Sequence, residues 1–457
     1  MSEENSKASA ELRLLKGTAD QPPQRQIRRQ AVIAAIREVF EAFGFDPLET
    51  PVLSHFDQLA QKYHPDDPIL QEIFHVTDRG KRDLGLRYDL TAPLCRFVGM
   101  ALRGRFPLPF KRYEIGKVFR DGPIKEGRLR EFTQCDADIV GTSDPLADAE
   151  CLAVADQVFQ RLGLEAEIEL SNRKILWAIL EEAGLDGSKR DPATTALDKW
   201  DKLGPQEVAR ELGGLGLDSA AIERIFALLT AGEGGAESLQ ALDQALQSSQ
   251  GREGLAELRA VLDASQELGL AIPVRFTPRL ARGLGIYTGT IFEFFCRDRS
   301  VFNFSIGAGG RFDRIVGEFL HPDEPQRQAD YPCVGLSFGI EPICVVLDKL
   351  AGDKGGPKTV TEALVVPMGA RRQALQLAGE LRRRGVKTDI DFSGAKLKKT
   401  FQRANALGIP YLVLLGEDEL AAGEVSLRNM DSGEQVRIPL GRAAEEIALR
   451  CGLAPPA

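Results

Sequence analysis

Three arginines around a short polar loop are the residues of this chain whose types and spacing most suggest chemistry. Arg120 ends one strand-like run, and Arg128 and Arg130 begin the next. A hairpin joined by this loop would bring several guanidinium groups together, and these planar, permanently charged groups suit phosphate oxygens. Phe132 shares the face of Arg130 by strand alternation, so its ring could stack on a base. The same spacing is typical of a solvated hairpin with ordinary charges, and that alternative stays open.

A second set of polar side chains recurs beside the same kind of strand. Asp89 and Thr91 follow a strand-like run at residues 86–88, and Gln134 and Asp138 lie four apart in a later run. Residues four apart in a strand face the same way. Carboxylates and an amide that converge could hold an ammonium group and an imidazole. Exposed strand charges are the alternative.

Two glycine-rich passages could let the backbone approach a ligand closely. Residues 307–313 are expected between a strand and a helix, and residues 335–341 where a strand meets a helix. Glycine permits such an approach, and a helix N-terminus favours an anion. Neither passage fits the dinucleotide-binding or Walker pattern.

An antiparallel sheet is the predicted scaffold for these side chains. Apolar residues at helical spacing predict a helix over residues 26–43, ended by Gly44, followed by an extended segment at residues 45–53. Runs at residues 73–77 and 84–88 predict a hairpin. Further strand-like runs occupy residues 110–119, 132–140, 167–170, 290–295 and 334–338. Strands joined by hairpins, with few crossovers, favour the α+β class.

Two changes of pattern divide the chain into domains. Residues 185–268 carry short helical patterns and no strand signal, which predicts a helical insertion in a larger domain over residues 12–350. Residues 351–358 have the composition of a linker. Beyond it, alternating strands and helices predict a small α/β domain with a parallel sheet over residues 359–457. Residues 1–11 are expected to be a disordered tip.

Composition narrows the class of protein. The chain has 457 residues, 43% of them hydrophobic, and no apolar run long enough to span a membrane. Its polar start has no apolar core, so no secretory signal is expected. Seven scattered cysteines and four scattered histidines argue against disulfides and a metal site, which favours a cytoplasmic protein. Because the net charge is −9, nucleic-acid binding would require local basic patches.

The order and the amino-acid sequences of several segments resemble those of class II aminoacyl-tRNA synthetases, and among them the histidyl-tRNA synthetases. The three class motifs resemble residues 45–53, 112–134 and 334–342. Two histidyl-specific signatures resemble LRYDLTAP at residues 86–93 and RGLGIYTGT at residues 282–290. Shorter matches occur at residues 16–18 and 416–420, so the resemblance covers roughly residues 15–450.

The resemblance implies a fold, a reaction and partners. The fold is a class II catalytic domain with an antiparallel sheet, followed by an anticodon-binding domain. Histidine and ATP would give histidyl-adenylate and pyrophosphate, and the histidyl group would then pass to the 3′ end of tRNA(His). Magnesium on the ATP phosphates is implied by the reaction class, although no ligand set is identifiable. A homodimer is implied by the first motif, which contains Pro51.

The resemblance also assigns roles to single residues. For ATP, Arg120 and Arg282 would flank the α-phosphate as the catalytic pair, Arg128 would reach the terminal phosphates, and Phe132 would stack on adenine. The residues assigned to histidine are Asp89, Thr91 and Gln134 for the α-amino group, and Asp138 and Tyr287 for the imidazole.

The candidates for tRNA binding are basic residues of the C-terminal domain. They are Lys396, Lys398, Lys399 and Arg403 around one helix, with Arg371 and Arg372 at the start of another. Binding through such residues should weaken steeply with salt. A solvated helix face is the alternative for each of them.

Three departures from the family pattern leave an alternative function open. Pro342 stands where the third motif usually has an arginine that contacts ATP, and Ile286 replaces one tyrosine of the histidine signature. The loop of the second motif has a single basic residue, Lys125. The alternative is a synthetase-like paralogue that binds histidine or tRNA and regulates a partner. The surviving arginines and the C-terminal domain favour an enzyme.

Overall fold

The computed structural model describes residues 12–61, 68–102, 107–124, 126–185, 187–231, 236–281, 286–352 and 356–453. The predicted disordered tip, Lys125 and Arg282 lie outside these ranges. The chain folds as two compact units, residues 32–350 and residues 351–457, with residues 20–31 grouped with the second. No helix among the described residues is long and apolar enough to cross a membrane.

The larger unit is built on an eight-stranded sheet in the order β1-β5-β6-β11-β10-β9-β7-β8. Its strands are β1 (Asp46–Pro47), β5 (Phe110–Phe119), β6 (Glu131–Val140), β7 (Ala166–Asn172), β8 (Val274–Phe276), β9 (Thr290–Cys296), β10 (Ser305–Arg311) and β11 (Cys333–Gly339). Neighbours from β5 to β7 pair antiparallel, and only the two outermost pairs are parallel. The predicted α+β class with an antiparallel sheet is confirmed.

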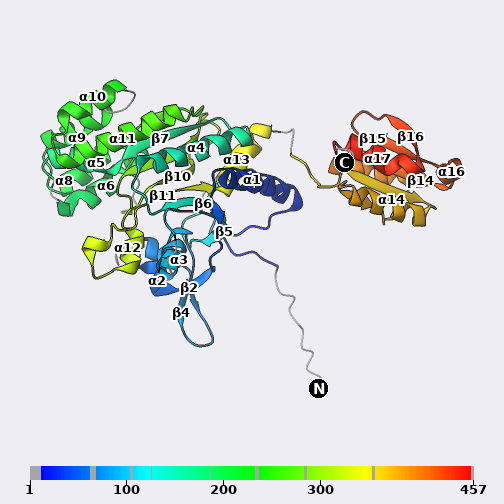
Figure 1. Cartoon of the computed structure of the whole chain (residues 1–457), viewed down its shortest axis with the longest axis horizontal. Coiled ribbons are helices and arrows are strands. Elements are labelled where there is room, and N and C mark those ends of the chain that lie inside the picture. Colours follow the sequence, from blue (N-terminus) through cyan, green and yellow to red (C-terminus); the bar gives the residue numbers. More distant parts are fainter. Residues whose placement is uncertain are drawn as a thin grey trace, which may run out of the picture. The chain divides into compact units, whose positions relative to one another are not determined.

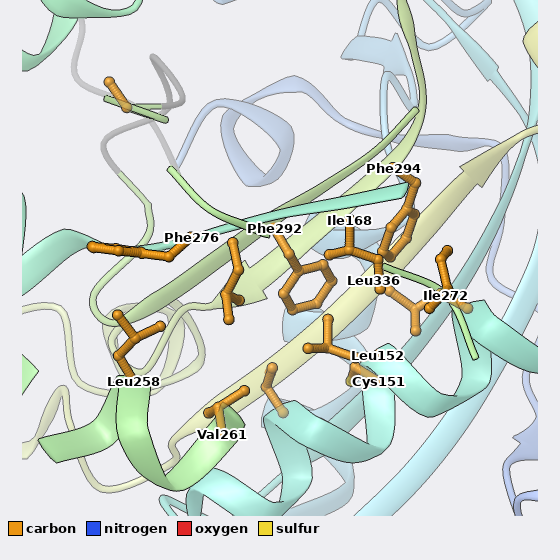
Figure 2. Packing of buried hydrophobic residues seen from close by; sticks show 14 of the residues in the cluster. Cys151, Leu152, Ile168, Leu258, Val261, Ile272, Phe276, Phe292, Phe294 and Leu336 are labelled. Carbon is orange, nitrogen blue, oxygen red and sulfur yellow. The ribbon is translucent and has the colours of Figure 1, made fainter. Parts of the chain in front are cut away.

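One face of this sheet is apolar and is covered by helices. Cys135, Ala137 and Ile139 of β6 point into a core shared with α4 (Pro145–Leu162) and α11 (Ser249–Glu267). Figure 2 shows side chains of these two helices, including Leu152 and Leu258, packed against Phe292 and other strand residues. The helices α1 (Pro23–Ala42) and α13 (Ile340–Ala351) add residues to the same core (Figure 1).

Local sequence fixes where α4 begins and ends. The side chain of Asp144 accepts a hydrogen bond from the backbone of Leu146, and Pro145 occupies the first turn. Gly163 ends the helix in the left-handed conformation, with φ of 62°. These signals set the length of α4, and its buried residues pack against the central strands.

The opposite face of the central strands is polar. Because side chains alternate along a strand, Gln134, Asp136 and Asp138 point away from the apolar core. The residues opposite them in the register share that face: Gly116, Glu114 and Arg112 in β5, and Gly339, Ser337 and Gly335 in β11. A face of charged and very small side chains can hold a ligand, whereas the apolar face is filled.

Two helices and a small sheet border the polar face. The apolar residues of α3 (Thr91–Leu102) and α12 (Ile315–Leu320) form a separate cluster with Val140 and Ile291 of the large sheet. The small sheet has the order β2-β4-β3, with β2 (Leu53–His55), β3 (His75–Thr77) and β4 (Asp83–Leu86), and lies beside α2 (Phe56–Ala60). The antiparallel β3–β4 pair confirms the predicted hairpin.

The stretch in which a helical insertion is predicted carries helices. After α5 (Arg173–Glu182), its helices are α6 (Arg190–Leu197), α7 (Trp200–Leu203), α8 (Pro205–Gly214), α9 (Ser219–Ala231) and α10 (Ala236–Ala245), followed by α11. Figure 1 shows them gathered at the end of the unit where α5 and α11 lie side by side.

The smaller unit has a five-stranded sheet in the order β13-β12-β14-β15-β16. Its elements are β12 (Ala363–Met368), α14 (Arg371–Arg383), β13 (Thr388–Ile390), α15 (Leu397–Leu407), β14 (Tyr411–Gly416), α16 (Glu417–Ala422), β15 (Glu424–Asn429), β16 (Gln435–Pro439) and α17 (Leu440–Arg450). The strands β12, β13 and β14 are parallel, as predicted, and β15 and β16 form the predicted hairpin. The helices α14 and α17 pack on one face and α15 on the other.

One prediction about the glycine-rich passages is wrong. Residues 307–311 do not lie between a strand and a helix, because they belong to the central strand β10. A Cβ at Gly309 would lie 2.1 Å from the carbonyl oxygen of Gly335 and 2.5 Å from the Phe292 ring. This glycine therefore serves close packing within the sheet rather than the approach of a ligand.

Candidate active site

A buried pair of opposite charges lies at the centre of the polar face. Asp138 Oδ2 is 2.7 Å from Nη2 of Arg112, whose side chain is fully buried. The same Nη2 donates to the carbonyl oxygen of Leu90 at 3.2 Å. Since an unpaired buried guanidinium would be costly, the ion pair with Asp138 stabilises Arg112 and fixes the position of the carboxylate.

A second buried pair connects this centre to the first class motif. Arg87 Nη1 is 2.6 Å from Glu114 Oε1 and donates to the carbonyl oxygen of Thr50 at 2.6 Å. Glu114 in turn accepts hydrogen bonds from the backbone and hydroxyl of Thr50, each at 2.9 Å. Residues 50 and 51 are thereby fixed to the strand that carries Arg112.

Asp136 makes the polar face acidic in a pH-dependent way. The pKa of Asp136 is raised to about 7, first by burial and then by the neighbouring Asp138, while Arg112 opposes the rise. Its strand neighbour Ser337 donates a hydrogen bond that also favours the charged form. Asp89 is close enough to Asp136 to add to the rise. A site with three neighbouring carboxyl groups suits a cationic group such as an ammonium.

The structure brings the five predicted histidine-binding residues to this face and its border. Asp89 is buried, and its Oδ1 accepts a hydrogen bond from the backbone of Ala92 in the first turn of α3, where Thr91 is half-buried. Gln134 donates from Nε2 to the Ser337 hydroxyl at 2.9 Å, and its buried Oε1 has no hydrogen-bond partner among the described residues. That oxygen is available to a donor on a ligand.

Tyr287 and Asp138 each pack against a glycine of the central strands. A Cβ at Gly310 would lie 2.9 Å from the Tyr287 ring, and one at Gly335 would lie 1.9 Å from Asp138 Oδ1. The small residues of β10 and β11 therefore leave room for these two side chains.

Each arginine of the second motif has an acceptor of its own. Arg120 donates from Nε to the carbonyl oxygen of Tyr88 at 3.0 Å, and its guanidinium carbon lies 5.0 Å from the centre of the Phe132 ring. Arg128 pairs with Glu72 at 3.3 Å, and Arg130 with Asp121 at 3.0 Å. The backbones of these residues stay close, because Arg120 N–H donates to the Arg130 carbonyl oxygen at 2.8 Å and Asp121 N–H to the Glu72 carbonyl oxygen at 2.8 Å.

The side chains of Arg120 and Phe132 are in contact. The guanidinium and the ring form a cation–π pair beside Tyr88, which directly precedes Asp89. A guanidinium group and an aromatic ring thus lie next to the acidic residues. Arg130 has a supporting role, because its backbone donates to the Gly17 carbonyl oxygen at 2.8 Å.

The segment that contains Arg282 is held at both ends by one residue. Arg173, buried at the start of α5, donates from Nη1 to the carbonyl oxygen of Ala281 at 2.5 Å. Its backbone N–H donates to the carbonyl oxygen of Gly289 at 2.8 Å. Arg282 itself lies outside the described residues, so its predicted place opposite Arg120 stays a prediction.

Pro342 fits the first turn of α13 and supplies no charge. Proline is tolerated there because the first backbone N–H groups of a helix have no partner within it. A Cβ at Gly127 would lie 3.5 Å from the Pro342 ring, so the loop of the second motif runs close over it. On the same helix, Lys349 pairs with Glu126 at 3.0 Å.

The side chains do not form a metal-binding cluster of their own. Among the described residues, no three His, Cys, Asp or Glu side chains are placed to hold an ion together. Magnesium does not require such a cluster, because it often keeps water and substrate phosphates as ligands.

The predicted tRNA-binding residues lie at the beginning of α15. Lys396 caps the helix, and Lys398 and Lys399 are exposed on its first turn. Arg403 lies one turn further on, 3.6 Å from Asp389 and 3.6 Å from Asp391. Because Arg403 lies beside two carboxylates, the three lysines contribute more of the net positive charge here than Arg403 does.

Sequence reasoning missed the residues that hold the centre of the site together. Arg87, Arg112, Glu114 and Asp136 were not among the predicted site residues, although Arg112 and Glu114 alternate on β5 as Asp136 and Asp138 do on β6. That alternation was the available signal. It did not reveal which strands are neighbours, and the pairing is what brings Arg112 opposite Asp138.

An antiparallel sheet that carries this site, with a helical insertion and a separate α/β unit, defines a class II aminoacyl-tRNA synthetase. Comparison with known proteins identifies the family. Residues 17–343 match the family model described as histidyl-tRNA synthetase, and residues 362–449 match the anticodon binding domain. The chain belongs to the histidyl-tRNA synthetase family.

Similar proteins agree with this assignment. Histidine–tRNA ligase 2 of Shouchella clausii is 40% identical over 93% of this chain and 97% of that protein. Histidine–tRNA ligase 1 of Bacillus cereus is 39% identical over 94% of this chain and 98% of its own length. The crystal structure of histidyl-tRNA synthetase from Nostoc sp. PCC 7120 superposes with a TM-score of 0.83 at 28% identity, over 96% of this chain and 99% of that chain. The alternative of a regulatory paralogue is not favoured.

Proposed function

We propose that this protein activates histidine with ATP and transfers the histidyl group to the 3′ end of tRNA(His). In the first step a carboxylate oxygen of histidine attacks the α-phosphorus of ATP, and pyrophosphate leaves with the electrons of the broken P–O bond. In the second step a hydroxyl of the terminal ribose attacks the carbonyl carbon, and AMP leaves. The observation that carries the proposal is the contact of Arg120 and Phe132 beside three acidic residues.

The acidic residues would bind histidine. The α-ammonium group would be held by Asp89, Thr91 and the unpaired oxygen of Gln134. The imidazole would lie between Asp138 and Tyr287, which pack on neighbouring glycine positions of β11 and β10. The Asp138 carboxylate, which is positioned by its ion pair with Arg112, would accept a hydrogen bond from an imidazole N–H.

The second motif would bind ATP. Arg120 and Arg282 would flank the α-phosphate and stabilise the charge that develops there. Arg128, which is half exposed and pairs with Glu72, would exchange this partner for the terminal phosphates. Adenine would stack on Phe132, on the side of the ring away from Arg120. ATP would enter as its magnesium complex, since the described side chains form no metal-binding cluster.

The smaller unit would bind the anticodon arm of the tRNA. Lys396, Lys398, Lys399 and Arg403 would contact its phosphates from the beginning of α15. We further propose that the protein is a cytoplasmic homodimer whose subunits meet through the segment around Pro51. The chain would have one catalytic domain over residues 12–350 and one anticodon-binding domain over residues 359–457, joined by the linker.

Charging of tRNA tests the proposed function. Purified protein, labelled histidine, ATP, magnesium and a tRNA(His) transcript should give acid-precipitable histidyl-tRNA, and tRNA(Phe) should give none. Protein that binds histidine or tRNA(His) without charging it would refute the proposal and support the regulatory alternative, for which the loss of the arginine at position 342 is the favouring observation.

A further inference from the structure

An exposed phenylalanine follows β13 in the smaller unit. Phe392 leaves 74% of its surface open to solvent, compared with 47% for Phe304, the other strongly exposed phenylalanine in the described part of the chain. A single exposed apolar side chain is ordinary on a protein surface. Its meaning therefore depends on what surrounds it.

The backbone on both sides of Phe392 is fixed. Asp391, which is buried, accepts hydrogen bonds from the backbone of Ser393 at 3.0 Å and from the hydroxyl of Thr400 at 2.7 Å. Ser393 accepts one from the backbone of Ala395 at 3.2 Å. Burial would raise the pKa of Asp391, but the hydrogen bonds from Ser393 and Thr400 outweigh it and lower the pKa, so the carboxylate stays charged near neutral pH. An aromatic ring is thus presented outward from a rigid turn.

Basic residues follow Phe392 closely in the sequence, although the chain as a whole is acidic. Residues 389–403 carry four basic and two acidic side chains, against a net charge of −9 for the whole protein. The two acidic side chains, Asp389 and Asp391, are both within 3.6 Å of Arg403. The exposed Lys396, Lys398 and Lys399 are left as the local excess.

The position in the sheet also favours a ligand. Phe392 follows the carboxyl end of β13, and α14 and α15 begin at the corresponding ends of the parallel strands β12 and β13. Ligands of parallel α/β sheets bind outside the carboxyl ends of the strands. An aromatic ring with lysines beside it is the combination with which proteins hold single-stranded nucleic acid, because the bases stack and the phosphates pair with the cations.

We propose that Phe392 is a stacking platform for one unpaired base of the tRNA anticodon loop, with Lys398 and Lys399 on the adjoining phosphates. This inference rests on the proposed function and adds a residue to it that charge alone does not identify. Stacking of a base on a ring contributes free energy that depends little on salt, whereas each lysine–phosphate contact releases counterions.

The test is the salt dependence of binding. The Kd for a tRNA(His) transcript is measured by filter binding at several salt concentrations for the unsubstituted protein, Phe392→Ala, Phe392→Tyr and Lys398→Ala. Phe392→Ala should raise the Kd roughly tenfold at every salt concentration without changing the slope of log Kd against log salt. Phe392→Tyr should keep the original Kd, and Lys398→Ala should lower the slope by about one phosphate contact.

Leu449→Ala is the matched control, because Leu449 is an exposed apolar residue of α17 in the same unit, with 47% of its surface open to solvent. It should leave both the Kd and the slope unchanged, and thermal unfolding shows that each variant is folded. An unchanged Kd for Phe392→Ala would overturn this inference but not the proposed function. A loss of slope in Phe392→Ala equal to that of Lys398→Ala would do the same. Absence of tRNA(His) binding by the unsubstituted protein would overturn the proposed function as well.

Discussion

Gly335→Ala is a one-carbon change aimed at the predicted contact between Asp138 and histidine. A Cβ at position 335 would lie 1.9 Å from Asp138 Oδ1, so the carboxylate must move by at least about 1.4 Å to reach an ordinary non-bonded distance. If it moves away from Arg112, the 2.7 Å ion pair lengthens to about 4 Å. With an effective dielectric constant of about 20, the attraction falls from about 6 to about 4 kcal/mol.

A loss of about 2 kcal/mol corresponds to roughly 30-fold in an equilibrium constant. Because Asp138 is proposed to hold the imidazole, we expect the KM for histidine to rise by 10- to 30-fold in pyrophosphate exchange, on the order of that loss. The KM for ATP should change little, because ATP is assigned to Arg120, Arg128 and Phe132. Asp138→Asn should likewise raise the KM for histidine and leave the KM for ATP nearly unchanged, without adding an atom.

Gly441→Ala is the control, since a Cβ at this exposed position of α17 would meet nothing within 4 Å. The reasoning is refuted if Gly335→Ala keeps the original KM for histidine while thermal unfolding shows a folded protein. An equal rise in both KM values would also contradict it, because that would indicate a general distortion of the sheet.

Three further predictions follow from named contacts. Because burial in the folded state raises the pKa of Asp136 from 3.8 to about 7, this carboxyl costs stability increasingly as the pH rises from 4 to 7, so Asp136→Asn should raise the Tm more at pH 8 than at pH 5. An equal gain at both pH values would contradict the raised pKa. Arg128→Ala should raise the KM for ATP about tenfold but not that for histidine, and an unchanged KM for ATP would remove Arg128 from the phosphate site. Pro342→Arg should lower the KM for ATP by about tenfold in steady-state exchange, and an unchanged KM would contradict the absence of a phosphate contact at this position.

Much of the fold could be predicted because its elements are marked by local signals. The run at residues 110–119 and the helical pattern at residues 397–407 coincide with β5 and α15 as the structure has them. The apolar spacing of both runs, and the glycine Gly408 that ends α15, act within one element. The strand β10 was missed because five of its seven residues, at positions 307–311, are glycines, one alanine and an arginine, which carry no apolar alternation.

The site was less predictable because its contacts join residues far apart in the chain. The resemblance of the sequence motifs assigned Asp138 to histidine. Nothing local indicated that Asp138 would pair across two strands with Arg112, which lies twenty-six positions earlier in the sequence. The ion pairs of the arginines in the second motif were unpredictable for a similar reason. Arg128 pairs with Glu72, whose position depends on the fold of a different segment, and Arg130 pairs with Asp121.

Histidine-dependent exchange of labelled pyrophosphate into ATP tests the central claim most directly. The unsubstituted protein should catalyse the exchange with histidine and not with other amino acids, and Arg282→Ala should abolish it. Arg275→Ala, which removes a half-exposed arginine from β8 at the other end of the sheet, is the matched control and should exchange normally. Absence of exchange by folded protein that still binds histidine would contradict the claim that this site forms an adenylate.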